Sequence, residues 1–207
     1  MRRIYVDLDD VLAQTGRMFL RILAQQFDRV VAFEELHSYH LGESLRLQPD
    51  ELTEFLRLAH QPDALGGVEP MPGAAETLTH WRARGYEVFV VTGRPPATRE
   101  SSLDWLSCHD IPFTALHFLD KYSQVYGDGQ GSPDGTLSLA DLPELDFCLA
   151  VEDFPGITAH LVRELGVPVA LFDRPWNREV AELDDAGGAP IRRCCDWSEI
   201  HQQFPEP

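Results

Sequence analysis

Three carboxylates lie within four positions near the N-terminus, at Asp7, Asp9 and Asp10. The residues before them, 3–6, are mostly β-branched or aromatic and predict a buried strand of a parallel sheet. The acids then lie at the C-terminal end of that strand, which is the edge where open α/β sheets bind ligands. Acids this close repel one another unless a cation is present, and Mg²⁺ is the hard cation that best suits oxygen ligands.

The spacing gives two of these acids distinct chemical roles. Asp7 is a candidate nucleophile that forms an aspartyl-phosphate. Asp9, two residues further on, leaves the strand on the same side and is a candidate general acid and base. The alternative interpretation is an acidic surface turn, which we set lower because a solvated turn rarely follows an apolar strand so abruptly.

The segment from Asp7 to Leu12 resembles motif I of the haloacid dehalogenase (HAD)-like superfamily, in its phosphatase form. Dehalogenases of that superfamily keep the first Asp but typically lack the second. The presence of Asp9 therefore favours phosphoryl transfer over carbon–halogen cleavage. The resemblance implies that three further motifs follow in order, each behind a strand.

Thr92, Gly93 and Arg94 follow a strand predicted over 87–92. The Thr92 hydroxyl can donate to a phosphoryl oxygen, and Gly93 lets the backbone approach the phosphate closely. This segment resembles HAD motif II, which holds the phosphate. Arg94 either adds a positive charge to that site or faces solvent, and the sequence leaves both alternatives open.

Lys121 follows a short strand predicted over 113–119 and is the sole lysine, since the other 16 basic residues are arginines. Its position resembles HAD motif III. The resemblance implies that its ammonium neutralises Asp7 and the incoming phosphate. The catalytic set predicted from the sequence is therefore Asp7, Asp9, Thr92 and Lys121, and the phosphate-binding set is Thr92, Gly93, Arg94 and Lys121.

Glu152 and Asp153 follow a strand predicted over 147–151 and resemble HAD motif IV, which completes the Mg²⁺ site. The motif implies that Asp153 is a direct metal ligand. Glu152 stands where many relatives have another Asp, so we expect a secondary or water-mediated role for it. The main-chain carbonyl of Asp9 usually joins the metal shell in this superfamily, so the predicted metal ligands are Asp7, Asp9, Asp153 and Glu152.

Strands alternate with helices along the chain, which predicts an α/β fold with a doubly wound, Rossmann-like parallel sheet of about five strands. The last of these strands is predicted over 167–172. Helical patterns between the first strand and the next predict a small cap over 14–70. Residues 1–13 and 71–207 then form the core domain, and 122–146 form an insert rich in Gly, Asp and Pro. Helices are predicted over 13–27, 49–60, 72–84, 98–108, 156–165 and 197–204.

Within the superfamily, the layout is similar to the 5′(3′)-deoxyribonucleotidases. The similarity is carried by the short helical cap and by segments 68–74, 120–121, 171–177 and 196–200. It implies a nucleoside monophosphate substrate and an electrostatic or structural role for Arg174. Another small phosphate ester, or a phosphate-binding regulatory module without turnover, are the alternatives. The intact Asp7 and Asp9 pair argues against the second.

Aromatic residues of the predicted cap, namely Phe19, Phe33 and Tyr39, either stack on a nucleobase or fill the core of the cap. For Phe19 we favour the core. His37 and His40 are expected to be polar cap residues and not metal ligands, because no third partner lies at a suitable spacing.

The composition limits the partners. A net charge of −17 over 207 residues makes nucleic-acid polymers and anionic membranes poor partners, whereas a small phosphorylated substrate remains compatible with a locally positive site. No run approaches the roughly 18 apolar residues of a membrane span. The four cysteines show no metal or disulfide pattern, so we expect free thiols and a cytoplasmic protein. The sequence leaves the oligomeric state open, with a homodimer as one alternative.

Overall fold

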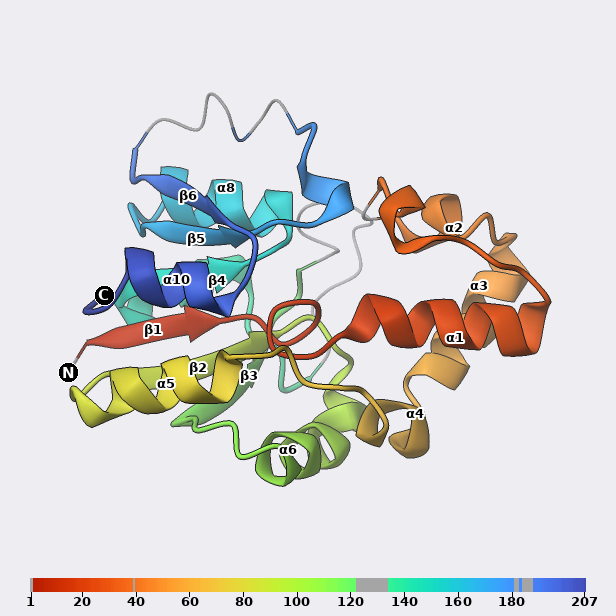
Figure 1. Cartoon of the computed structure of the whole chain (residues 1–207), viewed down its shortest axis with the longest axis horizontal. Helices are drawn as coiled ribbons and strands as arrows, with labels where there is room; N and C mark the ends of the chain where they lie inside the picture. Colours follow the sequence, from red (N-terminus) through yellow and green to blue (C-terminus); the bar gives the residue numbers. More distant parts are fainter. Residues whose placement is uncertain (1, 39, 122–133, 181–182, 184–187) are drawn as a thin grey trace.

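The computed structural model describes residues 2–38, 40–121, 134–180, 183 and 188–207. These residues contain a parallel sheet in the order β3-β2-β1-β4-β5-β6, which confirms the predicted doubly wound α/β fold (Figure 1). The order reverses between β1 and β4, and such a switch point is where doubly wound sheets bind ligands. The strands are β1 (Arg3–Val6), β2 (Glu87–Thr92), β3 (Ala115–Phe118), β4 (Phe147–Glu152), β5 (Val169–Phe172) and β6 (Ile191–Cys194).

The described sheet has six strands, one more than the five expected, and the additional strand is β6. It pairs in parallel with β5 at the edge of the sheet. Its sequence is Ile-Arg-Arg-Cys, and both arginines are exposed. An edge strand of four residues with two charged side chains has no apolar run, so hydrophobic pattern alone did not identify it.

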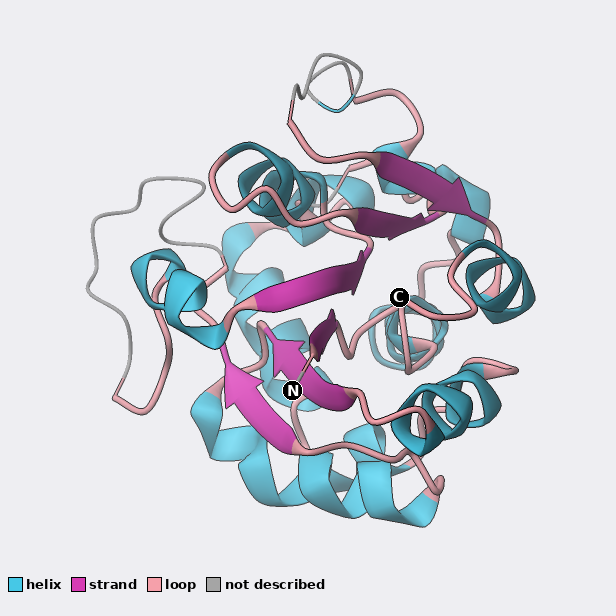
Figure 2. Cartoon of the chain, turned by 90° about the vertical axis from the view of Figure 1, so that its left-hand side faces the viewer, coloured by secondary structure: helices cyan, strands magenta, loops and turns pink. Residues whose placement is uncertain are grey.

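The two faces of the sheet carry separate cores, because successive residues of a strand point to opposite faces. Ile4 and Val6 of β1 belong to one core, and Tyr5 between them belongs to the other. The first core includes tryptophans from α5 (Ala74–Ala83), α6 (Arg99–Cys108) and α10 (Trp197–Gln203). The second packs against α8 (Pro155–Arg163) and the 3₁₀ helix η3 (Leu139–Leu145). Figure 2 shows the strands with helices on both sides.

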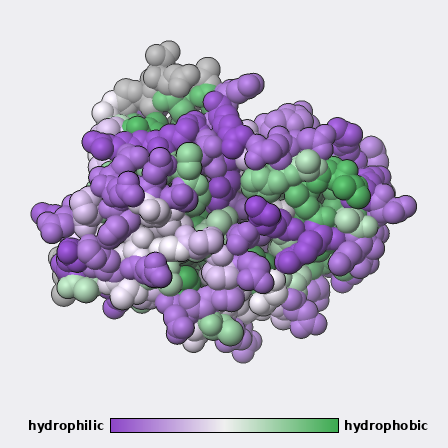
Figure 3. All heavy atoms as spheres, in the orientation of Figure 1, coloured by the Kyte–Doolittle hydropathy of each residue, from purple (hydrophilic) through white to green (hydrophobic). Residues whose placement is uncertain are grey.

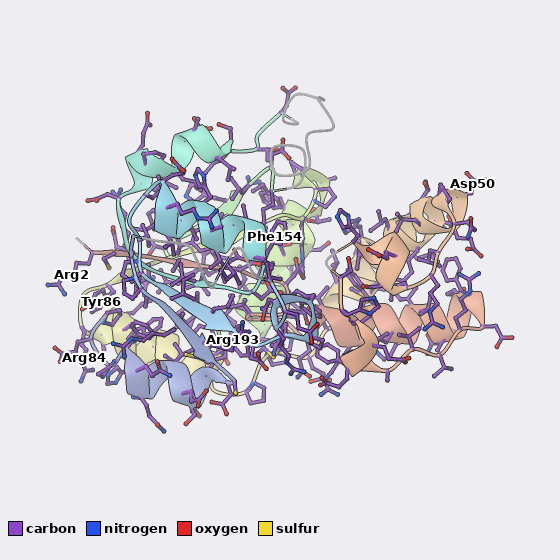
Figure 4. All side chains as sticks on the ribbon, turned by 90° about the horizontal axis from the view of Figure 1, so that it is seen from above. Arg2, Asp50, Arg84, Tyr86, Phe154 and Arg193 are labelled. Carbon is purple, nitrogen blue, oxygen red and sulfur yellow. The ribbon has the colours of Figure 1, made fainter. Side chains whose placement is uncertain are left out.

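Helices between β1 and α5 form a group beyond the C-terminal edge of the sheet (Figure 1). Phe55 is fully buried within this group and packs against Phe19 and Phe27, with ring centroids 5.4 and 6.0 Å away. Figure 4 shows the group extending away from the sheet, with Asp50 at its far end. Its elements are α1 (Thr15–Phe27), η1 (Phe33–Glu35), α2 (Leu41–Ser44), α3 (Pro49–Ala59) and α4 (Pro62–Gly66).

The chain enters and leaves this helical group through two segments that lie side by side. The backbone N–H of Gln14 donates to the Glu69 carbonyl at 2.9 Å, and the N–H of Met71 donates to the Leu12 carbonyl at 2.7 Å. The predicted boundaries of the cap, 14 and 70, fall at this paired crossing.

Part of the predicted insert over 122–146, namely 122–133, lies outside the described residues, as does Tyr39. The described part of the insert forms η3 and a parallel bridge between Leu119 and Leu137. None of the helices in the described ranges is long and apolar enough to cross a bilayer.

Candidate active site

The chain turns back on itself immediately after β1. The backbone N–H groups of Leu12 and Ala13 both donate to the Leu8 carbonyl at 2.9 Å. Asp10 adopts a left-handed conformation in this turn, with φ of 57°, which Asp tolerates better than most residues. Its carboxylate accepts from the N–H of Gly16 at 2.9 and 3.0 Å, in the first turn of α1. The acidic turn is therefore tied to the first helix of the helical group.

Lys121 brings two of the predicted acids together at the strand ends. Its Nζ lies 2.8 Å from Asp7 Oδ2 and 2.9 Å from Glu152 Oε2. All three side chains are buried, with at most 3% exposed. The Tyr5 hydroxyl donates to the same Glu152 oxygen at 2.7 Å. The lysine predicted from motif III thus lies directly beside the candidate nucleophile.

The two carboxylates that share Lys121 have opposite pKa shifts. Burial, reinforced by the charge of Glu152, raises the pKa of Asp7 well above its usual value. Burial also opposes ionisation of Glu152, but the charge and hydrogen bond of Lys121 and the N–H of Phe154 outweigh it, so the pKa of Glu152 is lowered. Burial likewise acts against the charge on Lys121, yet these acids raise its pKa well above normal. A single ammonium therefore leaves the Asp7 charge only partly compensated.

Asp7, Glu152 and Asp153 offer carboxylate oxygens that all lie within 4.8 Å of one another. Asp153 Oδ2 accepts from the indole N–H of Trp176 at 2.8 Å, whereas buried Oδ1 has no hydrogen-bond partner among the described residues. Burial and the charges of Glu152 and Asp10 raise the pKa of Asp153 well above normal. An orphaned buried oxygen in a set of carboxylates fits a hard divalent cation such as Mg²⁺.

Asp9 lies outside this group of three and faces a different partner. Arg94 donates to its carboxylate through Nε at 3.0 Å and through Nη2 at 2.7 Å. Thr15 donates to Asp9 Oδ1 at 2.5 Å, and the Thr92 hydroxyl lies 3.4 Å from Oδ2. Burial alone would raise the pKa of Asp9, but the charge and hydrogen bonds of Arg94 prevail and lower it.

Arg94 does not face solvent, which was one of the two alternatives left open by the sequence. Its side chain is 3% exposed, and Nη1 donates to the Ser102 hydroxyl of α6 at 3.2 Å. The Thr92 hydroxyl accepts from the backbone N–H of Arg94 at 3.2 Å, so the turn through Gly93 is closed on itself. The roles predicted for Thr92, Gly93 and Arg94 in holding phosphate stay predictions.

A cavity of about 440 Å³ lies between the acidic turn and the helical group. Asp9, Arg94 and Asp153 line it from the core domain, and the helical group adds both apolar and polar side chains. In Figure 3 apolar side chains gather over the helical group around α2. Phe19 lines the cavity and also packs on Phe55, so it belongs to the core of the helical group and to the cavity wall. Stacking of Phe19 on a nucleobase stays a prediction. The other residues lining the cavity from the helical group are Thr15, Gly16, Leu36, Ser38, His40, Leu41, Ser44, Leu52, Leu56 and His60.

Two residues whose contacts the sequence did not predict hold the acids in place. Arg174 donates to the Asp10 carbonyl from Nε at 3.0 Å and from Nη2 at 2.6 Å. Trp176, in η4 (Pro175–Asn177), holds Asp153. Both follow β5 and lie in the segment 171–177 that carries the family resemblance, which implied a role for Arg174 and none for Trp176.

The sequence of this chain is similar to those of known nucleotidases. The model of the family described as "5′ nucleotidase, deoxy (Pyrimidine), cytosolic type C protein" matches residues 1–149. A "putative 5′(3′)-deoxyribonucleotidase" of Chlorobaculum tepidum is 24% identical, over 97% of this chain and 89% of its own length. A "putative nucleotidase" of Halalkalibacterium halodurans is 21% identical, over 86% of this chain and 82% of its own length.

Solved structures show the same fold. The crystal structure of a "predicted phosphatase" from Clostridium acetobutylicum matches with a TM-score of 0.66 and 15% identity, over 100% of this chain and 99% of the other. A HAD family hydrolase from Deinococcus radiodurans, solved with bound phosphate and sodium, matches with a TM-score of 0.57 and 20% identity, over 100% and 96%.

Proposed function

This chain belongs to the 5′ nucleotidase, deoxy (pyrimidine), cytosolic type C family, and from that premise we propose that it is a Mg²⁺-dependent phosphomonoesterase acting on deoxynucleoside monophosphates. Membership makes the protein a HAD-like phosphatase or nucleotidase. The proposal adds the metal, the substrate and the roles of individual residues. The observation that carries it is the buried contact of 2.8 Å between Asp7 and Lys121, with a second acid, Asp9, at the adjoining cavity.

In the first step Asp7 attacks phosphorus. A carboxylate oxygen forms the new O–P bond, and the bond from phosphorus to the ester oxygen breaks. Asp9 gives its proton to the leaving alkoxide. Arg94 lowers the pKa of Asp9 in the substrate-free site, and the phosphoryl group competes for the same guanidinium, so binding of substrate restores a higher pKa to the acid.

In the second step water releases the enzyme. Asp9, now a carboxylate, takes a proton from a water molecule, whose oxygen attacks the phosphorus of the aspartyl-phosphate. The bond to Asp7 breaks, and inorganic phosphate and free Asp7 result. Lys121 stays within reach of the Asp7 carboxylate and offsets negative charge on the phosphoryl oxygens. Thr92 donates to a phosphoryl oxygen from the end of β2.

Asp7 and Asp153 would hold the metal, and Glu152, which pairs with Lys121, would act through that lysine. When bound, the cation supplies positive charge that offsets these carboxylates and the phosphoryl oxygens. The orphaned Oδ1 of Asp153 and the shared burial of Asp7 support this assignment. The main-chain carbonyl of Asp9 remains a predicted additional ligand.

Helices α1 to α4 are proposed to act as a cap that covers the site and selects the substrate. The cavity falls within the range of volumes that hold small organic ligands, and its lining combines charged groups of the acidic turn with apolar side chains of the helical group. A phosphate fits beside Arg94, and a nucleobase fits against Phe19, Leu52 and Leu56. Ser38, Ser44 and His60 offer polar atoms for the edge of the base.

The test is phosphate release from matched substrates, measured with Mg²⁺ and again with EDTA. The panel pairs dUMP with UMP, dTMP with dAMP, and 5′- with 3′-phosphates, and it adds glucose 6-phosphate and p-nitrophenyl phosphate. We expect a preference for one deoxynucleoside monophosphate by kcat/KM, lost with EDTA. Equal, weak turnover across the panel would contradict the nucleotide substrate but would still support phosphatase activity. Full turnover in EDTA would contradict the metal requirement.

A further inference from the structure

Trp176 connects the metal-binding carboxylates to the cap. Its indole Nε1–H donates to Asp153 Oδ2 at 2.8 Å, and the side chain is 8% exposed. This hydrogen bond occupies one carboxylate oxygen of Asp153 and leaves the other, Oδ1, buried without a partner among the described residues. An aspartate fixed in this way presents a single oxygen to a cation.

The other side of the same indole meets the cap. The ring of Phe33, in η1, lies edge-on to Trp176 with ring centroids 5.7 Å apart. One residue after Phe33 and two after Trp176, the exposed ion pair between Glu34 and Arg178 spans the same junction. Trp176 also lines the cavity. One side chain therefore contacts the cap, the cavity and a candidate metal ligand.

The neighbours of Trp176 keep its loop rigid. Asn177 donates from Nδ2 to the carbonyls of Asp153 and Phe172, each at 2.8 Å. Its Oδ1 accepts from the backbone N–H of Arg174 at 3.2 Å. Arg174 in turn holds the Asp10 carbonyl. The loop is thus bonded to both acid-bearing turns, which holds the backbone of Trp176 beside Asp153.

We propose that Trp176 is a positioning residue that orients Asp153 for single-oxygen coordination of the metal while its ring anchors the cap through Phe33. The inference rests on the proposed metal site. Groups that hydrogen-bond to metal ligands set ligand orientation, and their loss typically weakens metal binding about 10- to 100-fold. Substituting Trp176 by Phe keeps an aromatic side chain in the loop and removes the donor together with the pyrrole part of the indole, and Trp105→Phe makes the same change in volume elsewhere.

The first test is direct binding of Mg²⁺, measured by calorimetry on wild type, Trp176→Phe and Trp105→Phe. Trp105 is the matched control, since it is 1% exposed and its indole donates at 2.8 Å to the Val68 carbonyl, away from the acids. We expect about 10- to 100-fold weaker binding for Trp176→Phe and unchanged binding for Trp105→Phe. Equal weakening in both variants, or none in Trp176→Phe, would overturn the inference while leaving the proposed function in place.

A second measurement uses the wild-type protein alone, so it tests the inference even if the variant fails to fold. The four indole N–H groups are separately visible by ¹⁵N NMR, and the other three donate to main-chain carbonyls of Phe204, Val68 and Val11. Adding Mg²⁺ should shift the Trp176 indole signal most. An unmoved Trp176 signal with Mg²⁺ bound would overturn the inference. Absence of any Mg²⁺ binding to wild type would overturn this inference and the proposed metal requirement together.

The cap contact predicts a different split of kinetic constants. Phe33→Leu removes the ring against Trp176 but leaves the indole donor to Asp153. We expect KM for the nucleotide to rise several-fold with the Mg²⁺ dissociation constant unchanged. A parallel loss of Mg²⁺ affinity in Phe33→Leu would overturn the division between the two sides of the indole.

Discussion

Two charged clusters begin two residues apart in the chain, at Asp7 and at Asp9, yet their electrostatics differ. The inner cluster contains Asp7, Glu152 and Asp153 around Lys121, and its carboxylates outnumber its cations. The outer pair contains Asp9 and Arg94, in which one charge balances the other. The Asp7 side chain is 3% exposed and its pKa is raised, chiefly by burial. The Asp9 side chain is 26% exposed and its pKa is lowered, because Arg94 outweighs burial.

The difference shows how one short turn serves two kinds of chemistry. The inner acids lie at the ends of the neighbouring strands β1 and β4, where a bound cation neutralises their remaining negative charge or, without one, protonation does. The outer pair lines the cavity, and Asp9 already has Arg94 as its counter-ion. The pKa of Asp9 therefore changes when a substrate in the cavity competes for Arg94. Variants that remove a charge from one group and not the other separate these roles.

The largest effect is expected for Asp7→Asn in the inner cluster. The amide is nearly isosteric but is no nucleophile, so kcat should fall by at least about 10⁴-fold. The variant also removes one of three mutually repelling acids, so the metal-free protein should unfold at a temperature no lower than wild type. Steady-state phosphate release and thermal unfolding check both parts. Near-normal turnover would contradict the mechanism.

Asp9→Asn in the outer pair should lose less, about 10²- to 10⁴-fold in kcat, because it removes proton transfer and keeps the nucleophile. With p-nitrophenyl phosphate, whose leaving group needs no proton, the first step should still occur. A burst of nitrophenol equal to the enzyme concentration and a phosphorylated Asp7 in mass spectra are therefore expected. A variant without burst, as inactive as Asp7→Asn on this substrate, would show that the attack itself requires Asp9 and would contradict its assignment to proton transfer alone.

The sequence predicted the inner cluster better than the outer pair, for a physical reason. Asp7, Lys121 and Glu152 each lie at the end of a strand with a readable apolar pattern, so the shared C-terminal edge of the parallel sheet predicted that they lie on the same side of the molecule. The pairing of Arg94 with Asp9, 85 positions apart, depends on rotamers and on Ser102 behind the guanidinium. No local pattern encodes such a contact, and the sequence accordingly left Arg94 open.

The supporting residues were harder still to predict. Tyr5 reads as a core residue of a buried strand, and its bond to Glu152, 147 positions away, follows only once β1 and β4 are paired. Trp176 lies in a loop after β5, where no periodicity assigns a direction to the side chain. The strand β6 lacked an apolar run. In each case tertiary packing supplies information that composition and spacing do not contain.

The metal-free protein should lose stability as pH rises, because of Asp10, which lies between the two acid groups. Burial raises the pKa of Asp10 from its usual 3.8 to about 7. At Asp10 the native state therefore binds more protons than the unfolded chain between these values, so the contribution of this residue to stability is greatest below about pH 4 and falls until about pH 7. The loss from this residue is about 4 kcal/mol.

Asp10→Asn should flatten that dependence, since the amide stays neutral and its oxygen still accepts from the Gly16 N–H. Urea unfolding of both proteins in EDTA, at several values between pH 4 and 7.5, gives the two slopes. Asp7 and Asp153 shift in the same direction and remain in the variant, so part of the slope should persist. Identical slopes would show that Asp10 is ionised in the metal-free fold.

The smallest effect, about tenfold in kcat, is expected for Glu152→Gln, and it tests how the inner cluster is divided. Gln keeps the acceptor for the Tyr5 hydroxyl but removes one of the two anions that hold Lys121. If Glu152 acts through Lys121, the dissociation constant for Mg²⁺ should change little, whereas Asp153→Asn should weaken binding strongly.

Tyr5→Phe is the matched control, because it removes a bond to the same oxygen without altering charge, and it should lower kcat less than Glu152→Gln does. Loss of Mg²⁺ binding in Glu152→Gln equal to that in Asp153→Asn would make Glu152 a metal ligand, and the excess negative charge of the cluster would then be neutralised by the cation at all three acids.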